Sequence, residues 1–132
     1  MTNVAHDLWP DTFGVLTVTP PVKILREQAA ALGKKTRNVV QGYVTSTVID
    51  NDTTFHHTFY LKVPALDDYL YSLFRVQHGP NFYPVTITKS DRFARSEKYD
   101  AEEQFVEGLR RLFSEDATRD LIQALMVQSA KV

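Results

Sequence analysis

The sequence predicts a two-layer α+β fold, in which one helix precedes and two helices follow a four-stranded antiparallel meander. Apolar residues recur at helical spacing near both ends of the chain. Between these regions, segments of alternating apolar and polar residues are typical of strands with one buried and one wet face. The connections between these strands are short, which favours antiparallel pairing with the helices packed on the apolar side.

Composition places the chain among ordinary globular domains. It has 132 residues, 43% hydrophobic and 23% charged, so one domain spanning residues 1–132 can bury its own core. Cysteine is absent, which excludes a disulfide framework and a cysteine-based zinc or redox site. The formal net charge of −1 argues against a dedicated nucleic-acid binder. Neither a signal peptide nor a run of about eighteen apolar residues is present, so we expect a cytoplasmic protein without membrane contact.

An irregular arm is expected over residues 1–19, with a short strand at 14–19. Trp9 and Phe13 are large enough to anchor this arm on the domain. The Pro-Pro pair that follows suits the first turn of a helix. Four residues then form an apolar stripe at helical spacing: Val22, Leu25, Ala29 and Leu32. Gly33 is the expected end of this helix, with two lysines beside the negative end of the helix dipole.

Strands are expected over residues 38–50, 54–63, 69–78 and 85–89. A turn at residues 50–53 joins the first two, and the polar stretch 90–100 is expected to be a loop. Asp100 should cap the next helix, and a last helix is expected within residues 114–130.

The polar face of the sheet is the strongest candidate for a functional surface. Strand alternation assigns seven residues to it: Tyr43, His56, Tyr60, Lys62, Tyr69, Tyr71 and Arg75. Tyrosine and arginine are enriched where binding energy concentrates. The sequence therefore indicates a small interaction or accessory module that binds a protein partner or forms a homodimer through this face. Two other interpretations are a solvated sheet surface and a face covered by the N-terminal arm.

Two adjacent histidines, His56 and His57, must point to opposite faces of their strand. His57 lies in the apolar row between Phe55 and Phe59, which favours a hydrogen-bonded core residue. His56 lies in the polar row and is the better functional candidate. The four histidines show no metal-binding spacing, so neither a metal site nor a cofactor is predicted.

Whether the chain is an enzyme stays open, because the sequence contains no glycine-rich phosphate loop and no G-x-S-x-G motif. The enzymatic alternative is a metal-independent ribonuclease that uses His56, Tyr71 and Arg75 for acid–base chemistry and charge stabilisation. The second alternative is a small-molecule binder with a pocket between the sheet and the helices.

The segment from Ile24 to Val44 contains the pattern ILREQA, then LG, then K-T-x-N before a valine-rich strand. In this it resembles a group of short uncharacterised bacterial proteins. No activity is assigned to that group, so the resemblance implies only a bacterial, intracellular setting and assigns no functional residue.

Overall fold

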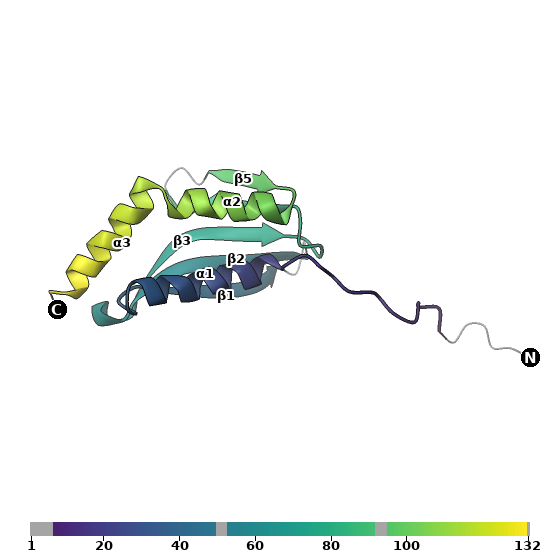
Figure 1. The fold of residues 1–132 in the computed structure, drawn as a ribbon, viewed down its shortest axis with the longest axis horizontal. Coiled ribbons are helices and arrows are strands. Elements are labelled where there is room, and N and C mark those ends of the chain that lie inside the picture. The colour runs from purple at the N-terminus through teal and green to yellow at the C-terminus, as the bar shows by residue number, and fades with distance from the viewer. Residues whose placement is uncertain (1–6, 50–52, 92–94, 132) are drawn as a thin grey trace, which may run out of the picture.

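Helices from both ends of the chain cover one side of an antiparallel sheet (Figure 1). The structure is a computed structural model that describes residues 7–49, 53–91 and 95–131. The elements, in chain order, are α1 (Pro21–Lys35), β1 (Gln41–Ile49), β2 (Thr54–Val63), the 3-10 helix η1 (Pro64–Leu66), β3 (Tyr69–His78), β4 (Val85–Lys89), β5 (Ser96–Tyr99), α2 (Glu102–Phe113) and α3 (Asp116–Ser129). The predicted α+β class, with one helix before the sheet and two after it, is confirmed for the described residues.

The sheet formed by the described residues has five strands in the order β1-β2-β3-β4-β5, one more than predicted. The additional strand, β5, lies within the stretch expected to be a loop. Its residues are Ser-Glu-Lys-Tyr, which show no apolar alternation, and it forms an edge that pairs only with β4. Most of the turn predicted at residues 50–53 lies outside the described residues.

Two helix boundaries differ from those predicted. α1 does not end at Gly33 but continues to Lys35, and the Thr36 hydroxyl bonds the backbone at both Leu32 and Val40. The left-handed conformation expected of a glycine is adopted by Arg37 and Asn38, with φ angles of 53° and 65°. α2 begins after Ala101, and Asp100 contributes its backbone N–H to the Gln104 side chain instead of a capping carboxylate.

The core lies between the sheet and the helices. Phe59 and Phe74 stack across β2 and β3, with 5.2 Å between their ring centroids, and Phe113 from the end of α2 packs on both rings. α1 approaches β1 so closely that a Cβ at Gly42 would lie 2.4 Å from the Ala29 Cα. The helix-facing side of the sheet therefore forms most of the hydrophobic core.

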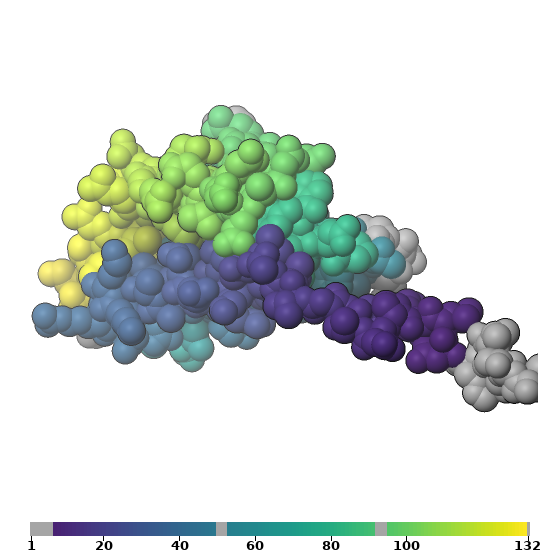
Figure 2. All heavy atoms as spheres, turned by 45° about the vertical axis from the view of Figure 1, so that its right-hand side comes forward, coloured from purple at the N-terminus to yellow at the C-terminus, as the bar shows by residue number. Residues whose placement is uncertain are grey.

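The N-terminal arm extends away from the domain (Figures 1 and 2). Trp9 and Phe13 are 73% and 79% exposed, so the prediction that they anchor the arm on its own domain is wrong. No strand forms at residues 14–19. Because the described part of the arm runs outward, it leaves the polar side of the sheet uncovered.

Candidate functional site

The side of the sheet turned away from the helices is called the open face below. Residues paired directly across an antiparallel ladder point to the same side of the sheet. The pairing of Tyr43 with Tyr60 and of Thr58 with Arg75 therefore places five of the predicted residues on this face. These are Tyr43, His56, Tyr60, Lys62 and Arg75. Six threonines accompany them: Thr45, Thr47, Thr54, Thr58, Thr86 and Thr88.

The charges of the open face have one sign. Lys62, Arg75 and Lys98 lie on it, because Lys98 pairs with Thr86, which in turn pairs with Gln77. None of the strand residues on this face is aspartate or glutamate. The one carboxylate in the described strands, Glu97, pairs with Ile87 and therefore points to the helix side. This arrangement favours an anionic binding partner.

An aromatic cluster stands at one end of the open face. The rings of Tyr43 and Tyr60 are 6.1 Å apart, and the Lys62 ammonium lies 5.7 Å from the centroid of the Tyr43 ring. Tyr43 is 45% exposed. The cluster combines rigid apolar area with hydroxyl groups and a cation, which suits it to a protein surface.

His56 occupies the central part of the open face on β2, between Thr47 of β1 and Gln77 of β3. Its Nε2 atom is buried and has no hydrogen-bond partner among the described residues. A buried polar atom without a partner destabilises the isolated protein.

A β-bulge in β3 reverses the predicted positions of two tyrosines. Phe59 pairs with Phe74, but the next residue of β2, Tyr60, pairs with Ser72, so Leu73 is the extra residue. Consequently Tyr71 pairs with Leu61 and Tyr69 with Val63, and both tyrosines point to the helix side. The prediction that they share the polar face is wrong. A one-residue insertion exchanges the two sides of a strand, and strict alternation cannot anticipate it.

The catalytic set of the ribonuclease alternative is therefore not assembled. His56 and Arg75 share the open face, whereas Tyr71 packs against the core near Leu121 of α3. The open face still offers a binding surface, but it holds only His56 and Arg75 of the three proposed catalytic residues.

On the helix side, His57 is buried and hydrogen-bonded, as its place in the apolar row predicts. Its Nε2 lies 3.0 Å from His78 Nε2, and its Nδ1 lies 2.7 Å from Ser46 Oγ. His78 Nδ1 lies 2.7 Å from the Gly79 carbonyl, which can only accept, so this nitrogen carries a proton. With both rings neutral, His57 Nε2–H donates to His78, and the Ser46 hydroxyl donates to His57.

The surroundings of His57 keep its ring neutral at neutral pH. Burial is the main cause that lowers the pKa of His57 to about 4, and the nearby His78, Arg26 and His56 lower it further. His57 therefore acts as a structural link between β1 and β3 at neutral pH. Its two partners, Ser46 and His78, could not be predicted from the sequence, because only the strand register brings them to His57.

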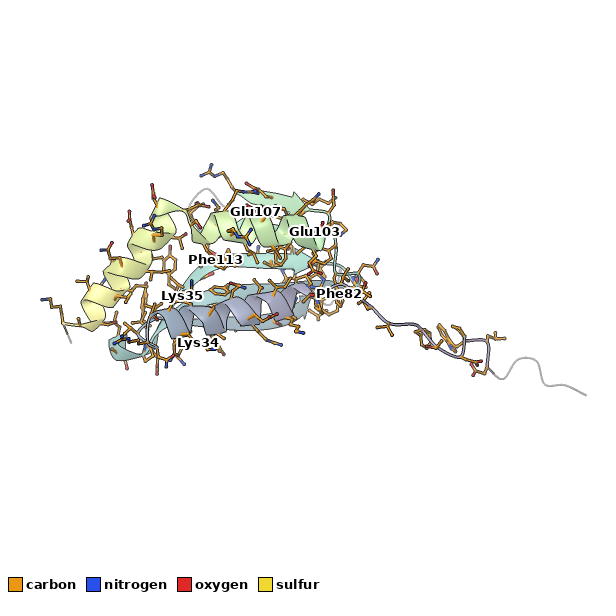
Figure 3. All side chains as sticks on the ribbon, in the orientation of Figure 1. Lys34, Lys35, Phe82, Glu103, Glu107 and Phe113 are labelled. Carbon is orange, nitrogen blue, oxygen red and sulfur yellow. The ribbon has the colours of Figure 1, made fainter. Side chains whose placement is uncertain are left out.

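An apolar groove runs along the helix side between α1 and α2. One part, of ≈ 290 Å³, has Phe59, Leu61 and Leu73 among its lining residues, and the other, of ≈ 230 Å³, has Val106. Gln28, Phe113 and Ser114 line both parts, so the two parts are adjacent. Figure 3 shows Lys35 of α1 and Phe113 of α2 at this groove. The groove lies where a pocket between sheet and helices is expected, and a small-molecule ligand for it stays a prediction.

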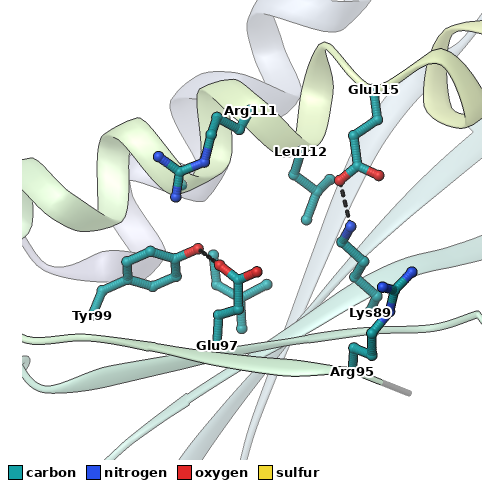
Figure 4. A pocket seen from close by; sticks show the side chains of 9 residues that line it. Lys89, Arg95, Glu97, Tyr99, Arg111, Leu112 and Glu115 are labelled. Atoms are coloured by element: carbon teal, nitrogen blue, oxygen red, sulfur yellow. Dashed lines mark hydrogen bonds and ion pairs between the residues drawn. The ribbon is translucent and has the colours of Figure 1, made fainter. Parts of the chain in front are cut away.

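A smaller cavity of ≈ 90 Å³ lies between β5 and α2 (Figure 4). Two contacts lie within this cavity: Lys89 of β4 binds Glu115, and the Tyr99 hydroxyl donates to Glu97 of the same strand. Burial and the hydrogen bond to Glu97 raise the pKa of Tyr99, while Arg111 opposes this shift. Tyr99 also packs against Gly108 of α2, where an added Cβ would lie 2.4 Å from the tyrosine ring, and this contact holds β5 against α2.

Among the described residues, no three His, Cys, Asp or Glu side chains are grouped so that they could hold a metal ion. In the same part of the chain, every helix is too short or too polar to cross a membrane. Comparison with known proteins finds no matching family model, no similar curated protein and no similar solved structure.

Proposed function

We propose that the chain is a small interaction or accessory module whose open face binds an acidic surface of a partner protein. The observation that carries this proposal is the segregation of charge: the strands present Lys62, Arg75 and Lys98 on one uncovered face without a carboxylate. The absence of cysteine fits a reducing, intracellular compartment.

The size of the open face suits a protein partner. The lengths and spacing of its strands give it an area of about 600 Å². Each partner in a standard protein–protein interface contributes about 800 Å². The tyrosine pair Tyr43 and Tyr60 provides an anchor near one end, and the threonines provide hydrogen bonds at a low entropic cost.

The same charges disfavour two other partners. A homodimer formed face to face would place Lys62, Arg75 and Lys98 opposite cations of the second copy, and such like-charge contacts are unfavourable. A nucleic acid requires more phosphate contacts than three spread cations can supply for tight binding. A folded partner with an acidic patch avoids both problems.

A matched pair of tyrosines tests which face binds. Tyr43 and Tyr69 are each 45% exposed, but Tyr43 lies on the open face and Tyr69 points to the helix side. Proteins recovered by the wild-type chain from an extract of its source organism should be lost with Tyr43→Ala and kept with Tyr69→Ala. Equal recovery by both variants would contradict the proposal.

A matched pair of arginines tests the charge requirement. Arg75 lies on the open face, and Arg119 is an exposed residue of α3. Arg75→Glu should abolish recovery of the partner, whereas Arg119→Glu should preserve it. Recovery should also fall as the salt concentration rises, because exposed charges are screened. A partner that binds equally well at high salt and to Arg75→Glu would overturn the electrostatic part of the proposal.

A further inference from the structure

The N-terminal arm is the most apolar exposed segment that the structure describes. Five of its side chains are 66% to 91% exposed: Leu8, Trp9, Phe13, Val15 and Leu16. Isolated apolar side chains on a surface are common, but a contiguous exposed set marks an interaction site. The arm therefore requires a binding surface that its own domain does not supply in this conformation.

Local hydrogen bonds give the arm a defined aromatic end. The Trp9 N–H donates to the Asp7 side chain at 3.1 Å, and the Gly14 N–H donates to the Thr12 hydroxyl at 3.1 Å. These two turns hold the rings of Trp9 and Phe13 at a centroid distance of 5.9 Å. A preformed pair of aromatic rings loses little conformational freedom on binding and is a typical anchor of an interface.

The arm leaves the domain at a fixed point. The Thr19 N–H donates to Glu102 Oε1 at 2.7 Å, and the Tyr83 hydroxyl donates to the Thr19 carbonyl at 3.1 Å. Burial, with Glu102 nearby, raises the pKa of Tyr83 to about 12, so this hydroxyl remains a donor at neutral pH. The anchor directs residues 7–18 away from the domain (Figures 1 and 2).

We propose that the arm of one molecule binds in the α1–α2 groove of a second copy of this chain, and that two copies exchange arms. The groove is apolar and unfilled, and the arm is apolar and unpacked. Their charges are also complementary, because Asp7 and Asp11 lie on the arm while Lys35 lines the groove; Arg110, which also lines it, pairs with Glu107. This inference uses other residues than the open face and does not depend on its function.

The direction of the arm favours a second copy over the arm's own groove. The described arm runs outward from Thr19, whereas α1 and the groove along it run in the opposite direction, from Ile24 to Leu32 (Figure 1). In this conformation the arm presents Trp9 and Phe13 away from its own domain, where a second copy can bind them.

The contact area also suits a stable dimer. A buried aromatic side chain contributes about 150–250 Å². Trp9 and Phe13 from two arms would therefore bury about 600–1,000 Å² before the groove surfaces are added, whereas a standard interface buries about 1,200–2,000 Å² in total. Reciprocal exchange thus reaches the size of a specific interface.

The test combines light scattering after size-exclusion chromatography with tryptophan fluorescence. Trp9 is the single tryptophan of the chain, so its emission reports the environment of the arm directly. The wild-type chain should be a dimer at micromolar concentration, with Trp9 emission shifted to shorter wavelength. Dilution should produce monomers and return the emission to that of an exposed indole.

Three full-length variants locate the contact. Phe13→Ser keeps the reporter but truncates the anchor, and should weaken dimerisation by about 30-fold or more. Ala31→Glu places a charge in the groove and should have a similar effect. Ala30→Glu is the matched control, because Ala30 neighbours Ala31 on α1 but does not line the groove, and it should remain dimeric.

Mixing completes the test. Phe13→Ser has an intact groove and Ala31→Glu has an intact arm. The mixture should therefore form a heterodimer through this one intact contact, although neither variant dimerises alone. A wild-type chain that is monomeric at all concentrations, with exposed Trp9, would overturn the proposal. So would a monomer with buried Trp9, which would place the arm in its own groove, and a dimer that survives both Phe13→Ser and Ala31→Glu.

Discussion

Lowering the pH from 7.5 to 5 should destabilise the protein through His57. The folded state holds the pKa of His57 at about 4, whereas an unfolded chain has the ordinary value of 6.5. As the pH falls through 6.5, the unfolded state binds a proton that the folded state does not bind until about pH 4. The contribution of this residue to stability is therefore complete above pH 6.5 and is lost progressively between pH 6.5 and pH 4.

The magnitude follows from the size of the shift. A pKa difference of this size corresponds to at most about 3 kcal/mol, and to about 2 kcal/mol of lost unfolding free energy at pH 5. Only 5% of His57 is exposed, so solvent screens the effect little.

Urea denaturation at pH 7.5 and pH 5, followed by circular dichroism, measures this effect. Other groups also titrate in this range, so the informative quantity is the difference between wild type and His57→Gln. Replacing the imidazole should reduce the pH-dependent loss of unfolding free energy by about 2 kcal/mol. If His57→Gln loses as much stability at pH 5 as the wild type does, the conclusion that burial keeps His57 neutral is wrong.

Two packing predictions concern the contacts of α1. Gly42→Ala should lower the unfolding free energy by about 1–3 kcal/mol, because its Cβ would meet the backbone of Ala29, whereas Gly79→Ala meets no atom within 4 Å and should be nearly neutral. Thr36→Val should cost about 1–3 kcal/mol by leaving the buried Val40 N–H without its acceptor, and Thr36→Ser should retain most of the stability. Urea midpoints of the four variants measure these changes in stability. The Gly42 prediction is wrong if Gly42→Ala is neutral, and the Thr36 prediction is wrong if Thr36→Ser is as unstable as Thr36→Val.

Hydrophobic patterning predicts the two layers of this fold, because the helices and the central strands bury their apolar sides between the layers. Val76 and Phe74 on β3 and Phe59 on β2 are buried as their alternation requires. An edge strand does not require a buried apolar side. β5 is held by backbone pairing with β4, so its polar sequence does not predict a strand. The end of α1 was also not predictable, because Arg37 and Asn38 adopt the left-handed conformation that a glycine usually provides.

The candidate site was only partly predictable. Tyr43, His56, Tyr60 and Lys62 lie on strands without an interruption between them, so their shared face followed from alternation. Tyr69 and Tyr71 lie beyond the bulge of β3, whose extra residue has no distinctive sequence. The uniform charge of the face required the position of Lys98, which became visible only with β5.

Hydroxyl-radical footprinting of the chain in complex with the partner it recovers tests the central claim most directly. Binding at the open face should protect Tyr43 and Tyr60 and leave the oxidation of Tyr69 unchanged. Protection of Tyr69 with Tyr43 and Tyr60 oxidised as in the isolated chain would place the partner on the helix side and contradict the account.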